Sequence, residues 1–227
     1  MMRSLNPICS VFKTTLISAC LLAGAVQAQT FEFVASQNAE IQQNNPDVNY
    51  GTVSSLALTP SDDVRRILLN FDLSALLGQV AGNDVDSAVI SLRVFENNGN
   101  WSKGKKGRID IHQLEQNSGW LSADRISNAT TWHCAQDLNL SNGQSDCDQP
   151  WAGGVFDRKA AAHVDVHKVM SNIIRLDVTK QIKQLLDDNQ GQSGWLLKKN
   201  RENKSGAIVF AAIQGDDSPK LTINANT

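Results

Sequence analysis

RILLNFDLS, from Arg66 to Ser74, is the stretch of sequence that decides the fold. Ile67, Leu69 and Phe71 stand at alternate positions, so a β-strand here directs all three side chains into one core. Leu68 adds an apolar side chain to the opposite face, as is typical of a strand inside a sandwich rather than at its edge. The stretch therefore predicts a buried strand around which a β domain forms.

Other short segments of alternating polarity surround this strand, and Gly, Asn, Asp and Pro residues separate them. We expect further strands around 31–33 and over 54–59, 85–96, 108–114, 194–199, 207–212 and 220–224. Segment 164–169 is compatible with either a strand or a helix. One helix is expected, from Thr179 to Asp188, because Ile182, Leu185 and Leu186 follow the helical period.

This order of elements predicts an all-β fold. Many short strands, one short helix and no regular alternation of strands with helices are typical of an antiparallel β-sandwich. We expect the jelly-roll type, in which the first and last strands lie near each other. No repeat or low-complexity linker interrupts residues 29–227, so we expect a single domain there.

Residues 1–28 have the features of an export signal peptide. Arg3 and Lys13 provide the positive start, Leu16 to Ala25 a short apolar run, and Ala25 to Ala28 a small-residue cleavage site. A lipid-anchored form is the alternative, because the residues before Cys20 loosely resemble a lipidation box. No second long apolar segment follows, so we expect a secreted protein, extracellular or periplasmic, without a transmembrane segment in its mature chain.

Two cysteines, Cys134 and Cys147, follow the signal peptide. An even pair in an exported chain predicts a disulfide. Zinc is the alternative because His133 adjoins Cys134, but neither cysteine belongs to a CxxC pair and no fourth ligand is evident. The formal net charge of −2 argues against nucleic acid as a partner.

The common catalytic motifs GxSxG and HExxH and the phosphate-binding loop are absent from the sequence. Paired carboxylates at 62–63, 187–188 and 216–217 lie in turn-like contexts, whereas glycoside hydrolysis needs two carboxyl groups that face each other across a cleft. We therefore expect a protein that is not an enzyme. A small polysaccharide lyase or hydrolase is the least favoured alternative.

Several landmarks occur in an order that resembles the DNRLRE domain family. They are NNPDVNYGTVSSLAL (44–58), RILLNFDLS (66–74), SAVISLRV (87–94), Trp120 followed by Thr131 and Trp132, LDVTKQIKQLL (176–186), GWLL (194–197) and SPKLTI (218–223). That family is similar to a group of secreted jelly-roll modules and includes the alginate-binding carbohydrate-binding module family ninety-six. The resemblance covers nearly the whole chain after residue 28, and it implies a jelly-roll fold and a polysaccharide ligand.

The chain departs from this family at two places. Asn70 stands where members usually carry a second basic residue, and Leu185 to Asp187 replace a Trp-rich segment. Modules of this kind are also usually attached to a polysaccharide enzyme, whereas this sequence predicts the module alone. The ligand that the resemblance implies is therefore a hypothesis.

Two basic loops are the candidate ligand-binding residues. One holds Trp101, Lys103, Lys105, Lys106 and Arg108, and the other holds Lys198, Lys199 and Arg201. An indole can stack on the C–H face of a sugar, and Lys or Arg can pair with uronate carboxylates or sulfates. Arg66 matches the family's basic position and would either face a groove with Asn70 or make a structural pair. Two solvated hairpin loops are the alternative interpretation.

Three aspartates in turns, Asp47, Asp216 and Asp217, are candidate ligands of a structural calcium ion, with ordinary turn chemistry as the alternative. His163, Asp165 and His167 would share one face of a strand and could hold a divalent metal. We favour a half-exposed strand, which shows the same alternation.

Four tryptophans, Trp120, Trp132, Trp151 and Trp195, are expected to pack within the protein, with Trp151 the most exposed. The function that these residues favour is a secreted, non-catalytic carbohydrate-binding module for an extracellular, acidic polysaccharide. The alternative of another class is a cell-surface structural or adhesive module that binds protein partners or assembles with itself.

Overall fold

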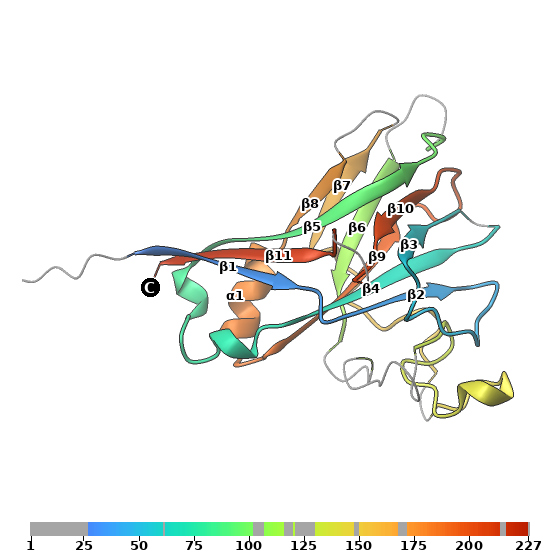
Figure 1. Ribbon diagram of the computed structural model, residues 1–227, viewed down its shortest axis with the longest axis horizontal. Coiled ribbons are helices and arrows are strands. Elements are labelled where there is room, and N and C mark those ends of the chain that lie inside the picture. Colours follow the sequence, from blue (N-terminus) through green and yellow to red (C-terminus); the bar gives the residue numbers. More distant parts are fainter. Residues whose placement is uncertain are drawn as a thin grey trace, which may run out of the picture.

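The computed structural model describes residues 27–60, 62–101, 107–115, 120, 130–147, 150–167, 172–213 and 217–226. Two antiparallel sheets form a β-sandwich, as predicted (Figure 1). Sheet A has the strand order β1-β11-β5-β10-β3, and β8 also pairs with β5. Its strands are β1 (Ala28–Val34), β3 (Ser55–Leu58), β5 (Val85–Asn97), β8 (Ile173–Asp177), β10 (Ile208–Ala211) and β11 (Lys220–Asn226).

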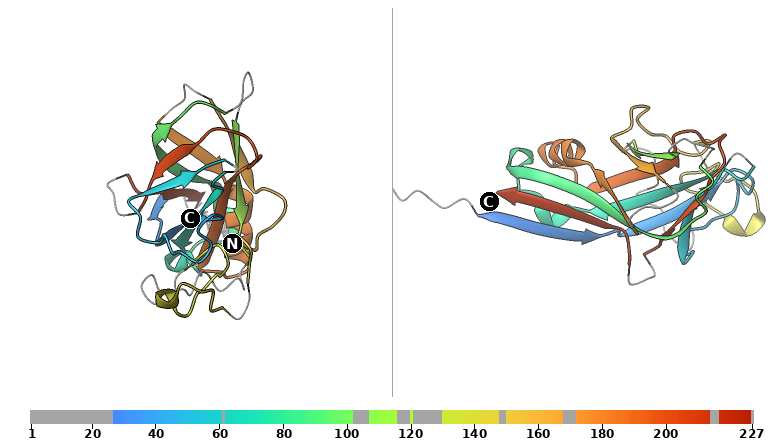
Figure 2. Two further views of the ribbon diagram at one scale, coloured as in Figure 1. Left: turned by 90° about the vertical axis from the view of Figure 1, so that its right-hand side faces the viewer. Right: turned by 90° about the horizontal axis from the view of Figure 1, so that it is seen from above.

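Sheet B has the strand order β2-β4-β9-β6-β7. Its strands are β2 (Gln37–Gln42), β4 (Arg65–Asp72), β6 (Gly107–Gln113), β7 (Ala162–Val166) and β9 (Gln192–Lys199). Most connections cross from one sheet to the other, and the first strand β1 pairs with the last strand β11, as expected of the jelly-roll type. The view along the long axis shows the strands of the two sheets on either side of the core (Figure 2).

The core between the sheets forms around β4, as its sequence predicts. Ile67, Leu69 and Phe71 are fully buried there, together with apolar residues of sheet A such as Ile90. Leu68 points to the opposite face of sheet B and is also fully buried. Residues 67–71 of β4 are therefore buried on both faces, which explains why the strand carries apolar residues on both.

A second apolar cluster covers the outer face of sheet B. Ile41, Leu68 and Leu196, from three neighbouring strands, pack with Trp132 and Trp151 from the segment between β6 and β7. The expectation that Trp151 is the most exposed tryptophan is wrong. Its side chain is 5% exposed and its indole nitrogen donates a hydrogen bond to the carbonyl oxygen of Thr131.

Local pattern alone did not predict two of the strands, β2 and β8. β2 is largely polar, and its buried Glu40 is accommodated because its carboxylate accepts hydrogen bonds from Gln42 Nε2 and from the backbone N–H of Ala57, both at 2.6 Å. The alternation along 108–114 predicts that Asp110 and His112 of β6 face solvent, but each is 5% exposed. His112 packs against Phe156 of the covering segment, and Asp110 accepts hydrogen bonds from Arg108 and Asn200. Segment 164–169 belongs in part to a strand, β7.

The expected helix is present as α1 (Thr179–Asp187), and its apolar residues Ile182, Leu185 and Leu186 are buried. The Asp177 carboxylate accepts hydrogen bonds from the backbone N–H of Thr179 at 2.9 Å and from its hydroxyl at 2.6 Å. These bonds satisfy a donor at the start of the helix and lower the pKa of Asp177. Figure 1 shows α1 near the end of the sandwich at which the C-terminus lies.

Cys134 and Cys147 form the predicted disulfide, so neither thiolate is a zinc ligand. Figure 1 shows the segment that they close, in yellow, at the end of the molecule away from α1. The predicted signal peptide, with Cys20, lies outside the described residues except for its last two positions. Within the described part of the chain, no helix has the length and apolar character needed to cross a membrane.

Candidate functional site

Arg66, one of the predicted binding residues, makes a structural pair. Its Nε and Nη2 donate to the two carboxylate oxygens of Glu202 at 2.7 and 3.1 Å, and its Nη1 donates to the carbonyl oxygen of Gly153 at 2.7 Å. The guanidinium carbon lies 4.7 Å from the centroid of the Trp132 ring. The side chain is 13% exposed, so Arg66 holds parts of the protein together and does not line an open groove.

Lys199, also predicted to bind a ligand, points into the protein. Its ammonium donates hydrogen bonds to three consecutive carbonyl oxygens, those of residues 204–206. Burial lowers the pKa of Lys199 to about 8. Lys199 therefore anchors the loop between β9 and β10 from within.

Trp101 lies beside this buried ammonium, with 5.3 Å between Lys199 Nζ and the ring centroid. The indole is 5% exposed, and its nitrogen donates to Asn97 Oδ1 at 2.7 Å. It packs on Gly107, where an added Cβ would come within 2.3 Å of the ring. A sugar can stack only on an accessible ring, so the prediction of Trp101 as a stacking platform is corrected.

The other predicted basic residues are divided between internal pairs and solvent. Arg108 Nε donates to Asp110 Oδ1 at 2.6 Å, and Lys198 Nζ lies 3.7 Å from Glu202 Oε2. Arg201 is exposed. Lys103, Lys105 and Lys106 lie outside the described residues. Among the described residues of the two basic loops, Arg108 and Lys198 therefore lie in ion pairs within the chain.

The predicted calcium ligands do not converge in the described part of the chain. Asp47 accepts a hydrogen bond from Ser145 Oγ and lies 2.9 Å from His133 Nδ1, and these two contacts lower its pKa. Asp217 lies 3.9 Å from Arg93 Nε, and Asp216 is outside the described residues. No three His, Cys, Asp or Glu side chains among the described residues gather as a metal-binding group.

His163, Asp165 and His167 are exposed, whereas Val164 and Val166 of the same segment turn toward the protein. This is the half-exposed strand that the alternation favoured.

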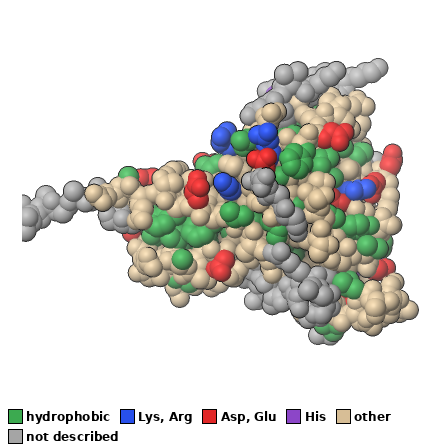
Figure 3. All heavy atoms as spheres, in the orientation of Figure 1, with side chains coloured by type: hydrophobic (Ala, Val, Ile, Leu, Met, Phe, Trp, Pro, Cys, Tyr) green, Lys and Arg blue, Asp and Glu red, His purple; other side chains and the backbone are tan. Residues whose placement is uncertain are grey.

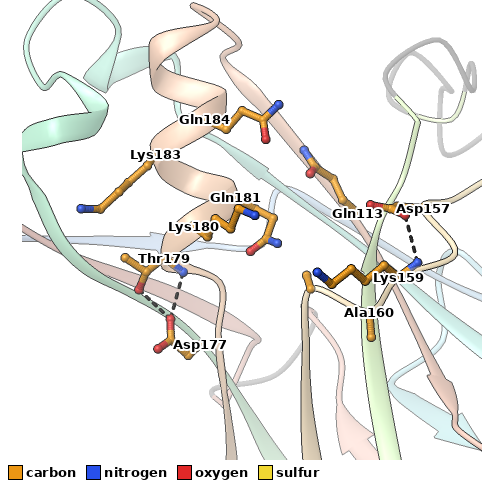
Figure 4. Close-up of a pocket in the computed structure, with 11 residues that line it drawn as sticks. Gln113, Asp157, Lys159, Ala160, Asp177, Thr179, Lys180, Gln181, Lys183 and Gln184 are labelled. Atoms are coloured by element: carbon orange, nitrogen blue, oxygen red, sulfur yellow. Dashed lines mark hydrogen bonds between the residues drawn. The ribbon is translucent and has the colours of Figure 1, made fainter.

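A polar groove of about 620 Å³ lies between α1 and the segment that leads into β7 (Figure 4). Gln113 at the end of β6, Asp157 and Lys159 before β7, and Gln181 and Gln184 on α1 line it. These residues come from three separate parts of the chain, so the groove exists only in the folded protein.

Packing of the elements around the groove determines where its side chains lie. Because Ile182 and Leu185 face the core, the helix directs Gln181 and Gln184 toward the groove. The opposite wall is held by backbone hydrogen bonds from Asp157 N to the Gln113 carbonyl at 3.0 Å and from Ala161 N to the Ile111 carbonyl at 2.8 Å.

The buried His112 adds a further bond to this wall. Its Nδ1 lies 2.8 Å from the carbonyl oxygen of Asp157, and since a carbonyl only accepts, Nδ1 carries the proton. The imidazole also packs against the ring of Phe156, with 4.8 Å between centroids. Desolvation lowers the pKa of His112, so the ring is neutral at pH 7.

The side chains in the groove are suited to hydrogen bonding. Figure 4 shows the amide groups of Gln113, Gln181 and Gln184 directed toward the space between α1 and β6, with the Lys159 side chain extending into it. A side-chain amide both donates and accepts, so neighbouring amides can bind pairs of hydroxyl groups. The Asp157 carboxylate accepts a hydrogen bond from the backbone N–H of Lys159 at 2.9 Å and stays accessible to a ligand.

Sequence reasoning did not identify these groove residues. The available signal was the pair Gln181 and Gln184, which stand three positions apart on the polar side of the predicted helix. Gln113, Asp157 and Lys159 carry no such signal, because only the fold brings them next to α1.

A scan against protein-family models finds no match for this chain, and a search of curated proteins finds none. The resemblance to the DNRLRE family therefore stays a prediction.

Proposed function

We propose that this protein binds a polysaccharide in the groove between α1 and residues 157–161 and does not cleave it. The observation that carries the proposal is the convergence of three amides and the Lys159 side chain on a single groove, whose lining also includes Lys180 and Lys183. Adjacent hydroxyl groups of a sugar match amide donors and acceptors, and the Lys159 ammonium suits a carboxylate or hydroxyl oxygen. The landmark order that resembles secreted jelly-roll modules points to the same ligand class.

The two carboxylates of the groove favour binding over catalysis. Asp177 accepts two hydrogen bonds from Thr179, and these lower its pKa, so it is ionised at neutral pH and cannot act as a general acid. Asp157 is exposed, and the other acidic side chain among the described lining residues is this ionised Asp177. Glycoside hydrolysis requires a protonated and an ionised carboxyl group on opposite sides of the bond.

Affinity electrophoresis tests the proposal, in native gels that contain alginate, pectin, glycol chitin or hydroxyethyl cellulose. We expect at least one polymer to retard the wild-type protein. The double variant Gln181→Ala/Gln184→Ala should lose about tenfold or more in affinity, since each lost hydrogen bond to a ligand contributes about 0.5–1.5 kcal/mol. Gln190→Ala is the matched control, because Gln190 is exposed just after α1 and lies outside the groove.

Absence of retardation by every polymer would contradict the proposal, as would equal affinities of the wild type and the double variant. Release of reducing ends or of unsaturated products from the retained polymer would show that the protein is an enzyme instead. The alternative prediction, an adhesive module, requires a protein partner or self-assembly. Light scattering after size-exclusion chromatography measures the self-assembly.

A further inference from the structure

The outer face of sheet A carries three cations on three neighbouring strands. Ser91 of β5 stands opposite Arg175 of β8 and also opposite Lys220 of β11, so the two cations flank it on neighbouring strands. The strand spacing places their backbones about 10 Å apart. Arg93 follows two residues after Ser91, about 7 Å along β5 and on the same face. The intervening Leu92 is fully buried, which fixes the outward direction of its neighbours.

An accessible aromatic ring adjoins these cations. Phe95 is 56% exposed and follows Arg93 by two residues. It lies in a β-bulge, because Val94 stands opposite Phe210 and Glu96 opposite Val209, which leaves Phe95 without an opposite residue on β10. Alternation along β5 already directs Phe95 to the same outer face as Ser91 and Arg93, and the bulge leaves the exposed ring without an opposite residue at the margin of the cationic region.

Two of the three cations on this face form no ion pair with the described part of the chain. Arg175 and Lys220 are exposed and form no ion pair or hydrogen bond with any described residue. Arg93 has only Asp217, at 3.9 Å, and the side chains of these two residues are 39% and 50% exposed. Figure 3 shows Lys and Arg side chains gathered on this face, with acidic and hydrophobic side chains beside them.

We propose that Arg93, Phe95, Arg175 and Lys220 form a second glycan-binding surface, the cationic face, which takes the carboxylate or sulfate groups of an acidic polysaccharide. Arg and Lys bind such groups by charge-assisted hydrogen bonds, and the Phe95 ring offers a surface for the C–H face of a sugar. This inference rests on the proposed function in that the ligand is a polysaccharide, but it concerns different residues.

The cationic face lies close enough to the groove for one polymer chain to contact both. Asp177, which lines the groove, follows Arg175 by two residues on β8, or about 7 Å. A polysaccharide fits this arrangement better than duplex nucleic acid does, because the chain as a whole is acidic and three cations provide few phosphate contacts. An exposed ring beside the cations also suits a sugar, whose apolar face can stack on it.

The test compares the wild type with the triple variant Arg93→Gln/Arg175→Gln/Lys220→Gln and with Phe95→Ala. The probes are polygalacturonate, which supplies carboxylates, dextran sulfate, which supplies sulfates, neutral dextran, and a DNA duplex. Affinity is measured between 50 and 200 mM salt, because counterion release makes the affinity for a polyanion fall steeply over this range. We expect the triple variant to lose about tenfold or more in affinity for one of the two acidic polymers. The slope of log affinity against log salt should fall by about 2–3, roughly one for each lost contact.

Two matched variants control for charge and for loss of apolar surface. Arg93→Lys/Arg175→Lys/Lys220→Arg keeps all three charges and should retain the salt slope. Leu138, in the segment that the disulfide closes, is 56% exposed, as Phe95 is. Leu138→Ala should bind as the wild type does, whereas Phe95→Ala should bind about threefold to tenfold more weakly.

The outcomes separate this inference from the proposed function. Acidic-polymer binding that the triple variant loses and the groove variant Gln181→Ala/Gln184→Ala retains supports the cationic face and overturns the groove as a site. Binding that only the groove variant loses overturns the cationic face. Unchanged affinity and salt slope in the triple variant, a preference for the DNA duplex, or no binding of either acidic polymer also overturns it.

Discussion

Arg66 and Glu202 lie 136 residues apart in the chain and join through two parallel hydrogen bonds, Nε to Oε1 at 2.7 Å and Nη2 to Oε2 at 3.1 Å. The same guanidinium donates to Gly153 and lies against Trp132. One side chain of β4 therefore fastens both the loop after β9 and the segment that covers sheet B. A planar guanidinium can do this because it presents five N–H groups in a fixed geometry.

We expect Arg66→Ala to lower the free energy of unfolding by about 2–3 kcal/mol, because Glu202 and the Gly153 carbonyl lose a charged donor in a largely buried place. Arg66→Lys should recover only part of this loss, since an ammonium cannot reproduce the forked geometry. Urea unfolding followed by tryptophan fluorescence measures both. Arg158→Ala, at an exposed position, is the control and should stay within about 0.5 kcal/mol of the wild type. An Arg66→Ala protein as stable as this control would contradict the role given to the pair.

Lys199→Met should destabilise the protein by about 1–3 kcal/mol at pH 7, because it leaves the buried carbonyl oxygen of Gly206 and the partly buried ones of residues 204 and 205 without their donor. The pKa of Lys199 is lowered to about 8 from an ordinary 10.5, so between these values the unfolded chain binds more protons than the folded one. Wild-type stability should therefore gain a contribution as the pH rises from 8 to 10.5. Unfolding curves across this range should lose that slope in Lys199→Met, and an identical slope in both proteins would refute the assignment.

His112 should make the wall of the groove sensitive to acid. Its pKa is lowered from 6.5 by desolvation, so below pH 6.5 the unfolded chain takes up a proton more readily than the folded protein does. The contribution of His112 to the free energy of unfolding is thus fully present above pH 6.5. It is lost as the pH falls through the lowered pKa of His112 in the folded protein. In His112→Asn the amide can still donate to the Asp157 carbonyl but does not titrate, so its melting temperature should vary less between pH 6.5 and 5. Parallel pH profiles of the two proteins would count against this account.

The disulfide between Cys134 and Cys147 should stabilise the segment that covers sheet B. The two residues are separated by 13 positions. A disulfide that closes a loop of this length lowers the entropy of the unfolded chain and so stabilises the folded state by about 3 kcal/mol. Cys134→Ser/Cys147→Ser should therefore unfold at a lower urea concentration by a corresponding amount. The wild type treated with a reductant should behave like this variant, and a variant that resists urea as well as the oxidised wild type does would contradict the prediction.

Several elements of the fold were predicted from the sequence, and others were not. The strand at 66–74 and the helix that begins at Thr179 were predicted, because each depends on the spacing of apolar residues within a short segment. The Cys134–Cys147 pair was predicted from the number of cysteines that follow the signal peptide. β2 was not, because its polar side chains are buried by partners such as Ala57 that lie elsewhere in the chain.

The candidate site was harder to predict from sequence. Trp101 and Lys199 look like exposed ligand-binding residues in the sequence, yet the fold turns both inward against each other. Phe95, by contrast, is an apolar residue on the outer face of β5, and it is 56% exposed because no described segment covers it there. The direction of a side chain and the residues that it contacts depend on neighbouring strands. A local sequence pattern carries no information about those strands.

The sequence by itself determined that this chain forms an antiparallel β-sandwich with one short helix, because the periodicity of apolar residues is a local property of each strand and helix. Only the tertiary structure decided that Arg66 pairs with Glu202, that three glutamines meet in one groove, and that Arg93, Arg175 and Lys220 share one face. These relationships depend on strand register and on the packing of distant segments. A charged side chain shows the same local pattern whether it meets a partner, a ligand or water.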